Sequence, residues 1–212
     1  MSITVRYRAA MGSDHYFSAS PRSDSRTRTI RVHLAGRDVD LATAAGVFSP
    51  DHLDQGTRVL LEAVPAPPAS GHLLDLGAGW GPIALAMALQ APDATVWAVD
   101  VNERALELVR ANAARLGLDN VNAVLPSDVP DDLAFATIWS NPPIRVGKQE
   151  LHAMLSTWLP RLDEDAAAWL VVAKHLGAES LQRWLAEELS FDVERAQTSK
   201  GFRVLAAARP VG

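Results

Sequence analysis

The residues best suited to chemistry in this chain are Asn141, Pro142 and Pro143, which follow an apolar stretch that includes Ile138 and Trp139. Proline cannot donate a hydrogen bond to a β-ladder, so the strand must end here. Asn141 then presents a carboxamide on a stiff turn at the carboxyl end of a strand, where open α/β sheets bind ligands. Its oxygen and the Pro142 carbonyl can both accept hydrogen bonds from one amino group. We predict that these two residues align an amine for alkylation. The alternative is a turn that only ends the strand.

A glycine-rich turn precedes this site by about sixty residues, between a short apolar strand and an apolar helix. Gly77, Gly79 and Gly81 permit a tight turn and let the backbone approach a ligand closely. Asp75 lies at the end of the preceding strand. The dinucleotide fingerprint G-x-G-x-x-G is not met, because Pro82 occupies the position of its last glycine. The spacing therefore disfavours a nicotinamide dinucleotide.

A second apolar strand, from Thr95, ends in the carboxylate of Asp100, nineteen residues after Gly81. This is close to the offset at which an acidic side chain binds ribose hydroxyls. A carboxylate can accept both hydroxyl protons. The alternative role, capping the next helix, suits Asn102 better. Asp100 is therefore predicted to hold a ribose.

The pattern D-x-G-x-G-x-G, from Asp75 to Gly81, together with the Asn-Pro-Pro turn, resembles the motifs of class I methyltransferases that use S-adenosylmethionine. The resemblance implies that the glycine turn lies under the methionine part of this cofactor and that Asp128 meets the adenine amine. It also implies S-adenosylhomocysteine as the product and no metal. The implied cofactor-binding residues are Asp75, Gly77, Gly79, Gly81, Asp100, Val101, Ser127, Asp128 and Asn141.

Further segments, between about residues 14 and 208, resemble the small-domain ribosomal RNA methyltransferases, and most closely their 16S guanine-N2 group. They are Asp14-His-Tyr-Phe-Ser18, Gly46-Val-Phe-Ser49, Asp54-Gln-Gly-Thr57, Asn141-Pro-Pro-Ile-Arg145 and Lys200-Gly-Phe-Arg-Val204. The resemblance implies methyl transfer to the exocyclic amine N2 of a guanine. The implied partner is ribosomal RNA or the small ribosomal subunit.

The chain departs from many amine methyltransferases at Ile144, where they carry an aromatic residue that stacks on the target base. Stacking must then come from another ring, with Phe48, Phe202 or Tyr16 as candidates and ordinary packing as the alternative for each. The expected substrate-binding residues are Phe48, Ile144, Arg145, Lys148 and Phe202.

The charge is unevenly distributed along the chain, although the net charge is −5. Residues 1–37 contain seven arginines against Asp14 and Asp24, and residues 195–209 contain four basic residues and no carboxylate. This asymmetry favours a phosphate-binding role, and Arg22, Arg26, Arg28 and Arg31 are the residues we expect to serve it. The alternative is a solvated basic segment. The six histidines show no metal-ligand spacing, and the chain has no cysteine.

No apolar run reaches the roughly eighteen residues that span a bilayer, and no signal peptide is evident. We therefore expect a soluble cytoplasmic enzyme without a membrane partner. The sequence does not decide between a monomer and a homodimer.

The expected fold is α/β: a Rossmann-like class I methyltransferase fold with a mostly parallel seven-stranded sheet, an antiparallel last strand and an N-terminal β-hairpin extension. Strands 192–198 and 202–208 are joined by only three residues, which forces an antiparallel pairing. We expect an arginine-rich extension at 1–64 and a cofactor-binding core at 65–212. The other expected elements include a hairpin within 26–43, helices 56–64, 103–116, 149–162 and 177–189, and a strand at 166–172.

Three other functions are compatible with parts of this pattern. They are a methyltransferase acting on a protein glutamine amide or another amine, a nicotinamide-dependent oxidoreductase, and a binding protein without turnover. Ile144 and the arginine-rich start disfavour the first, and the glycine spacing disfavours the second. The third has no support, since every expected motif residue is present.

Overall fold

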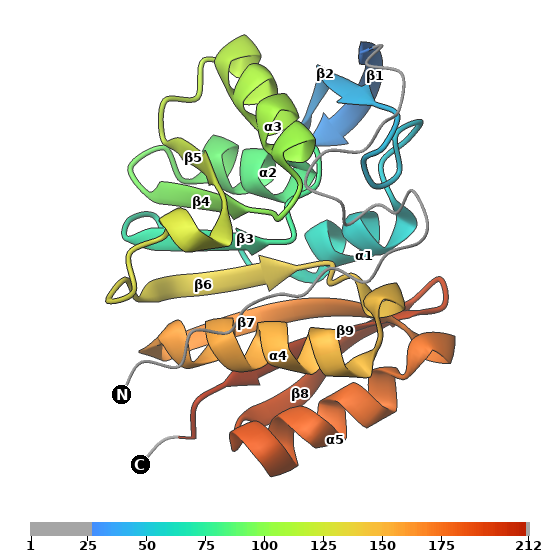
Figure 1. Ribbon diagram of the computed structural model, residues 1–212, viewed down its shortest axis with the longest axis vertical. Helices are drawn as coiled ribbons and strands as arrows, with labels where there is room; N and C mark the ends of the chain where they lie inside the picture. The colour runs from blue at the N-terminus through green and yellow to red at the C-terminus, as the bar shows by residue number, and fades with distance from the viewer. Residues whose placement is uncertain (1–26, 211–212) are drawn as a thin grey trace.

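The computed structural model describes residues 27–210, apart from the side chain of Arg145. These residues form a seven-stranded sheet flanked by helices and a separate two-stranded hairpin (Figure 1). The sheet contains β3 (His72–Leu76), β4 (Thr95–Val99), β5 (Val121–Val124), β6 (Phe135–Ser140), β7 (Leu162–Ala173), β8 (Asp192–Ser199) and β9 (Phe202–Ala208). The helices are α1 (Gln55–Ala63), α2 (Pro82–Gln90), α3 (Glu103–Leu116), α4 (Lys148–Trp158) and α5 (Ala178–Leu189).

The strand order is β5-β4-β3-β6-β7-β9-β8. Neighbours from β5 to β7 pair in parallel, whereas β9 is antiparallel to both β7 and β8. The β8–β9 turn is made by Lys200 and Gly201, which both have positive φ angles. The expected fold class is therefore confirmed, including the antiparallel last strand.

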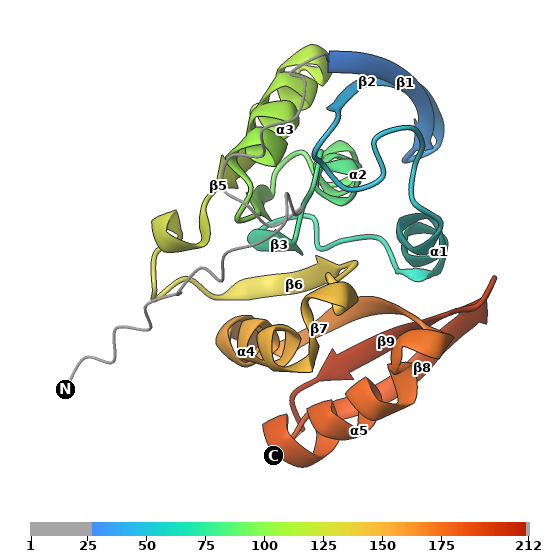
Figure 2. The same ribbon diagram turned by 45° about the vertical axis from the view of Figure 1, so that its right-hand side comes forward.

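The two faces of the sheet carry separate hydrophobic cores. One core joins the sheet to α1, α2 and α3, through residues such as Leu60, Met87 and Val109. The other joins the sheet to α4 and α5, through residues such as Leu155 and Leu185. Figure 2 shows α4 and α5 on one side of the sheet and α1 and α2 on the other. Both faces of the parallel strands are thus covered, as expected for an α/β sheet.

The hairpin consists of β1 (Thr27–Leu34) and β2 (Arg37–Ala44), with all eight pairs in register. Its apolar residues alternate inward and form a third core with α2 and α3. Asn112 of α3 fixes the hairpin: its Oδ1 accepts from the Ala42 amide at 2.6 Å, and its Nδ2 donates to the Ala42 carbonyl at 2.9 Å. The predicted hairpin is confirmed, and it is anchored to the sheet through α3.

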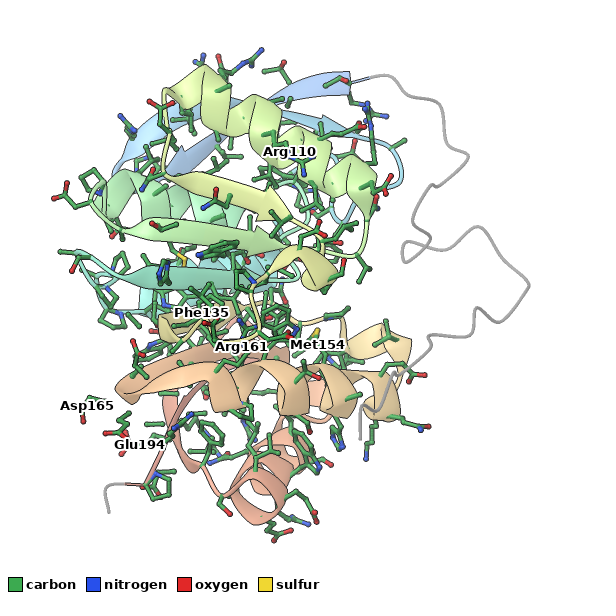
Figure 3. The ribbon with its side chains drawn as sticks, turned by 60° about the vertical axis from the view of Figure 1, so that its left-hand side comes forward. Arg110, Phe135, Met154, Arg161, Asp165 and Glu194 are labelled. Atoms are coloured by element: carbon green, nitrogen blue, oxygen red, sulfur yellow. The ribbon has the colours of Figure 1, made fainter. Side chains whose placement is uncertain are left out.

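The predicted C-terminal end of helix α4 was wrong. Helix α4 was expected to continue to Leu162, but it ends at Trp158 and a short 3₁₀ turn, η3 (Leu159–Arg161), follows. Pro160 lies in this turn and cannot donate the hydrogen bond that would continue the helix. Arg161 lies over the rings of Phe135 and Trp158, at 5.1 and 4.8 Å from their centroids (Figure 3).

Strand β7 begins at Leu162, four residues earlier than expected, because the exposed acidic residues 163–165 are extended rather than part of a loop. Figure 3 shows Asp165 of β7 and Glu194 of β8 at the end of the sheet where these two strands begin. This end is opposite the carboxyl ends of the parallel strands.

Within residues 27–210, no helix is long and apolar enough to cross a membrane.

Candidate active site

The two sequence motifs meet at the carboxyl edge of the sheet. A cavity there is lined by residues of the glycine turn, by Asn141 at the end of β6, and by residues in and before α1. Figures 1 and 2 both show α1 beside the carboxyl end of β6. The lining residues are Phe48, Ser49, Asp54, Thr57, Gly77, Ala78, Gly79, Trp80, Pro82, Ile83 and Asn141.

The three glycines of the turn all have positive φ angles, of 79° for Gly77, 55° for Gly79 and 96° for Gly81. A Cβ on Gly81 would lie 3.0 Å from a methyl group of Val109, so this glycine permits close packing of α2 against α3. A Cβ on Gly79 would meet no atom within 4 Å. The space above Gly79 can therefore accept a ligand that approaches the backbone.

Asp75 is fully buried within β3 and supports the start of α2. Its Oδ2 accepts a hydrogen bond from the Ala84 amide at 2.8 Å, whereas its Oδ1 has no partner among the described residues. Burial, with a smaller contribution from the nearby charge of Asp100, raises the pKa of Asp75 to about 8, and the hydrogen bond from the Ala84 amide opposes this rise. The protonated form is thus favoured at pH 7. The predicted contact between Asp75 and a cofactor stays a prediction.

Asp100 connects the end of β4 to the glycine turn. Its Oδ2 accepts from the Gly79 amide at 2.8 Å, and its Oδ1 accepts from the Asn102 amide at 2.9 Å. Burial raises the pKa of Asp100, and these backbone donors oppose that rise. Each carboxylate oxygen has a further lone pair with which it can bind a ribose hydroxyl. Asp100 therefore has a structural role that the sequence did not reveal, and the ribose contact stays a prediction.

The remaining predicted cofactor residues lie on neighbouring strand ends. The side chain of Val101 is 48% exposed and offers an apolar surface next to Asp100. Ser127 and Asp128 are exposed on a 3₁₀ turn, η1 (Pro126–Asp128), after β5, and the Ser127 hydroxyl donates to Asp128 Oδ1 at 3.2 Å. Asn102 caps α3 as expected, since its Oδ1 accepts from the Arg104 amide at 3.0 Å.

Asn141 is held by two side chains of α1 and its cap. Its Nδ2 donates to Asp54 Oδ2 at 2.8 Å and to Thr57 Oγ1 at 3.0 Å. A carboxylate only accepts hydrogen bonds, so the amide nitrogen must face Asp54. Within the described part of the chain no hydrogen bond engages Asn141 Oδ1, which is left to accept from a ligand.

Asn141 is half-buried and hydrogen-bonded, which its place at the end of a strand did not predict. Its partners Asp54 and Thr57 received no role. One pattern in the sequence did point to Asp54: an Asp three residues before a Thr, at the start of an apolar helix, is typical of an N-cap. That spacing explains the contact of Asp54 with the Thr57 amide, at 3.0 Å, but it does not predict Asn141 as a further partner.

The two prolines fix the backbone after Asn141. Pro143 has φ −73° and ψ 75°, and the Ile144 amide donates to the Pro142 carbonyl at 2.8 Å, which together form an inverse γ-turn. The Pro142 carbonyl, predicted to accept from a substrate amine, therefore already accepts one hydrogen bond. Its second lone pair remains for a ligand.

The predicted substrate-binding residues divide into two groups. Phe48 is 41% exposed and lines the cavity together with Asn141. Phe202 does not line it; its ring packs against Gly56, where an added Cβ would lie 3.0 Å from Phe202 Cε1. Ile144, on the short turn η2 (Ile144–Val146), packs against the core of α4 and α5.

The basic residues near the site are only partly described. Lys148 begins α4, and its Nζ donates to Ser180 Oγ at 3.4 Å. The side chain of Arg145, and all of Tyr16, Arg22 and Arg26, lie outside the described residues. Arg28 pairs with Asp51, and Arg31 pairs with Asp40 at 2.8 Å across the hairpin. These ion pairs favour the solvated-surface alternative for Arg28 and Arg31.

Among residues 27–210, no group of three or more His, Cys, Asp or Glu could hold a metal ion.

Comparison with known proteins identifies relatives over most of the chain. The family described as "Methyltransferase small domain" matches residues 38–206. The uncharacterized protein YbxB of Bacillus subtilis (strain 168) is 37% identical over 200 residues, which cover 93% of this chain and 99% of that protein. Ribosomal RNA small subunit methyltransferase C of Aeromonas hydrophila subsp. hydrophila is 39% identical over 135 residues, which cover 62% of this chain. The match spans 38% of that longer relative.

A solved structure shares the fold. The T. thermophilus 16S rRNA N2 methyltransferase RsmC, in complex with AdoMet and guanosine, superposes with a TM-score of 0.77 at 22% identity. The superposition covers 88% of this chain and 52% of that chain. At this level of identity the likeness establishes a common architecture, consistent with the strand order described above.

Proposed function

Because this chain belongs to the methyltransferase small domain family, we propose that it transfers a methyl group from S-adenosylmethionine to the amine N2 of a guanine in 16S ribosomal RNA. An amine is proposed as the methyl acceptor because of the orientation of the Asn141 side chain. Its nitrogen donates to Asp54 and Thr57, so its oxygen is left to accept from a donor such as an amine. The choice of ribosomal RNA is supported by relatives named ribosomal RNA small subunit methyltransferase C.

The glycine turn provides the surface on which we place the cofactor. S-adenosylmethionine supplies an electrophilic methyl group on a sulfonium sulfur. The open space above Gly79 fits the methionine part, and the free lone pairs of Asp100 fit the ribose hydroxyls. We place the adenine ring against Val101, with its amine toward Asp128. The chemistry of the residues present therefore fits this cofactor.

Asn141 and Pro142 then act on the acceptor amine. The lone pair of guanine N2 is delocalised into the ring, which makes it a weak nucleophile. Hydrogen bonds from the amine to Asn141 Oδ1 and to the Pro142 carbonyl favour a pyramidal nitrogen with its lone pair directed at the methyl group. In-line displacement then depends on position and electrostatics, and the proton leaves to water, so we assign no general base.

The acceptor base must leave its stack to reach this cavity, so we propose a flipped or single-stranded nucleotide. Two aromatic residues line the cavity, Trp80 and Phe48. Trp80 is buried and Phe48 is exposed, so we propose that Phe48 stacks on the base. Arg145 and Lys148 lie four and seven residues after Asn141, and we propose that they bind neighbouring phosphates. The partner is then ribosomal RNA, free or in the small subunit.

Labelled S-adenosylmethionine, offered with naked 16S rRNA, small subunits, whole ribosomes and a glutamine-containing peptide, tests this proposal. We expect label in RNA, recovered as N2-methylguanosine after digestion to nucleosides. Label on the glutamine amide, or on a different nucleoside, would contradict the guanine assignment. Tight binding of a nicotinamide dinucleotide would contradict the cofactor.

A further inference from the structure

We propose that Asp54 and Thr57 are positioning residues that fix the amide of Asn141 in the one orientation that can accept from the substrate amine. The inference rests on the proposed function only in naming Asn141 as the residue that meets the amine. Asp54 and Thr57 do not touch the acceptor in this scheme. They act through Asn141, from a helix that precedes it by more than eighty residues.

The contacts form a closed ring of hydrogen bonds. Asp54 Oδ2 accepts from the Thr57 amide at 3.0 Å and from Asn141 Nδ2 at 2.8 Å. Thr57 Oγ1 accepts from the same Asn141 nitrogen at 3.0 Å. An amide nitrogen has two hydrogens, so both donors of Asn141 are used. A rotation of the amide by 180° would direct its oxygen at the carboxylate of Asp54, which is unfavourable because both groups only accept.

The ring is held in place by packing. Thr57 is only 3% exposed, and the next turn of α1 contributes Val59 and Leu60 to the same core as Trp139, two residues before Asn141. Gly56 allows the close approach, because a Cβ there would lie 2.9 Å from Asp54 Oδ2 and 3.0 Å from Phe202 Cε1. The position of α1 is thus fixed relative to the end of β6, which is the condition for Asp54 to orient Asn141.

The orientation decides whether the site attracts or repels an amine. With the ring intact, the cavity presents the acceptor Oδ1. Without it, the amide can rotate and present its N–H groups to the N–H groups of the substrate, which leaves donors facing donors. Removal of the hydrogen-bond partner that orients a metal ligand typically costs about 10–100-fold, and we expect a loss on the same scale for the partner that orients Asn141.

Three variants of Asp54 separate positioning from helix capping. Asp54→Ser keeps a good N-cap for α1, but its hydroxyl is too short to reach Asn141. Asp54→Asn keeps both the cap and an acceptor at the same reach. We expect single-turnover methylation to fall about 10–100-fold in Asp54→Ser and to stay within about threefold of wild type in Asp54→Asn. Thr57→Val should lower the rate and Thr57→Ser should restore it. Asp93→Ser, an exposed aspartate far from the cavity, is the matched control.

Two further measurements make the outcome unambiguous. The affinity for S-adenosylmethionine should be equal in Asp54→Ser and Asp54→Asn. The midpoint of thermal unfolding should be only slightly lower in Asp54→Ser, since both variants cap the helix and only Asp54→Asn keeps the contact with Asn141. A wild-type rate in Asp54→Ser would overturn the proposal. So would equal losses in Asp54→Ser and Asp54→Asn, which would indicate a role of the charge instead.

The side-chain amide of Asn141 gives a readout that does not depend on the acceptor. In ¹⁵N-labelled wild-type protein, its protons should exchange with water more slowly than those of the exposed Asn122, and Asp54→Ser should remove this protection. If the wild type methylates another amine, the guanine proposal fails, and the Asp54 variants are compared on that amine. If it methylates none, rapid exchange at Asn141 alone overturns the positioning proposal.

Discussion

The two halves of the site both contain aspartates, but only one of these aspartates binds a side chain from a distant segment. On the cofactor side, Asp75 and Asp100 accept from the backbone amides of Ala84, Gly79 and Asn102. On the acceptor side, Asp54 accepts from the Thr57 amide and also binds the side chain of Asn141. A backbone contact is available to any sequence that makes the same turn, whereas a side-chain contact requires two particular residues. The cofactor half is thus built from local geometry, and the acceptor half depends on a pairing between distant segments.

The largest expected effect is at the acceptor half. Asn141→Ala should lower the single-turnover rate constant by about 10²–10³, the scale for losing one preorganised polar contact. Stability should also fall by roughly 1 kcal/mol, because the variant removes hydrogen bonds to Asp54 and Thr57. Affinity for S-adenosylmethionine, measured by calorimetry, should change little. An unchanged rate would reduce the Asn-Pro-Pro turn to a strand terminator.

The corresponding change in the cofactor half should affect binding. Asp100→Ala should weaken S-adenosylmethionine binding by roughly 1.5–3 kcal/mol, as for a hydrogen bond to a charged group. The variant also frees the Gly79 amide, so part of the loss should come from a less ordered turn. Gly79→Ala helps to separate the two causes, since it strains the turn and leaves Asp100 in place. Calorimetry that shows wild-type affinity for Asp100→Ala would remove Asp100 from the site.

Asp75 should reveal its burial through the pH dependence of stability. Its folded pKa of about 8 lies above the unfolded value near 4, so between these values the native state keeps a proton that the unfolded chain has released. The stability contributed by Asp75 is therefore complete below about pH 4 and is lost as the pH rises toward 8, by up to about 1.4 kcal/mol per pH unit.

Asp75→Asn keeps an acceptor for the Ala84 amide and cannot titrate. The free energy of unfolding, from urea titrations at a series of pH values, should thus depend less on pH in this variant. Equal slopes for the variant and the wild type would show that the carboxyl group is ionised in the folded protein.

The smallest effects should distinguish the hairpin from the catalytic turn as RNA contacts. Arg31→Ala removes an exposed ion pair with Asp40 and should change stability by less than about 1 kcal/mol, with the salt dependence of RNA binding unaltered. Lys148→Ala should reduce the slope of log affinity against log salt by about 0.7, the value for one phosphate contact with a single strand. A reduced slope for Arg31→Ala would restore the phosphate role that the arginine-rich segment first suggested.

The difference between local geometry and pairing of distant segments explains what could be predicted from the sequence. Local spacing in the sequence was sufficient to predict the glycine turn, the carboxylate of Asp100 at a strand end and the antiparallel pairing of β9 with β8 across a short link. The pairing of Asp54 with Asn141 could not be predicted, because it depends on how α1 packs against the sheet. The early start of β7 was missed because residues 163–165 are acidic and exposed, and therefore show no apolar alternation.

The position of β9 has a consequence for biosynthesis. Although residues 202–208 are among the last of the described chain to be made, they lie between β7 and β8, and Phe202 packs beneath Gly56 of α1. During translation, α1 therefore lacks part of its support until β9 has emerged from the exit tunnel. We expect the nascent protein to acquire its cofactor surface before its acceptor surface, so that methylation competence arrives only after β9 has taken its place in the sheet.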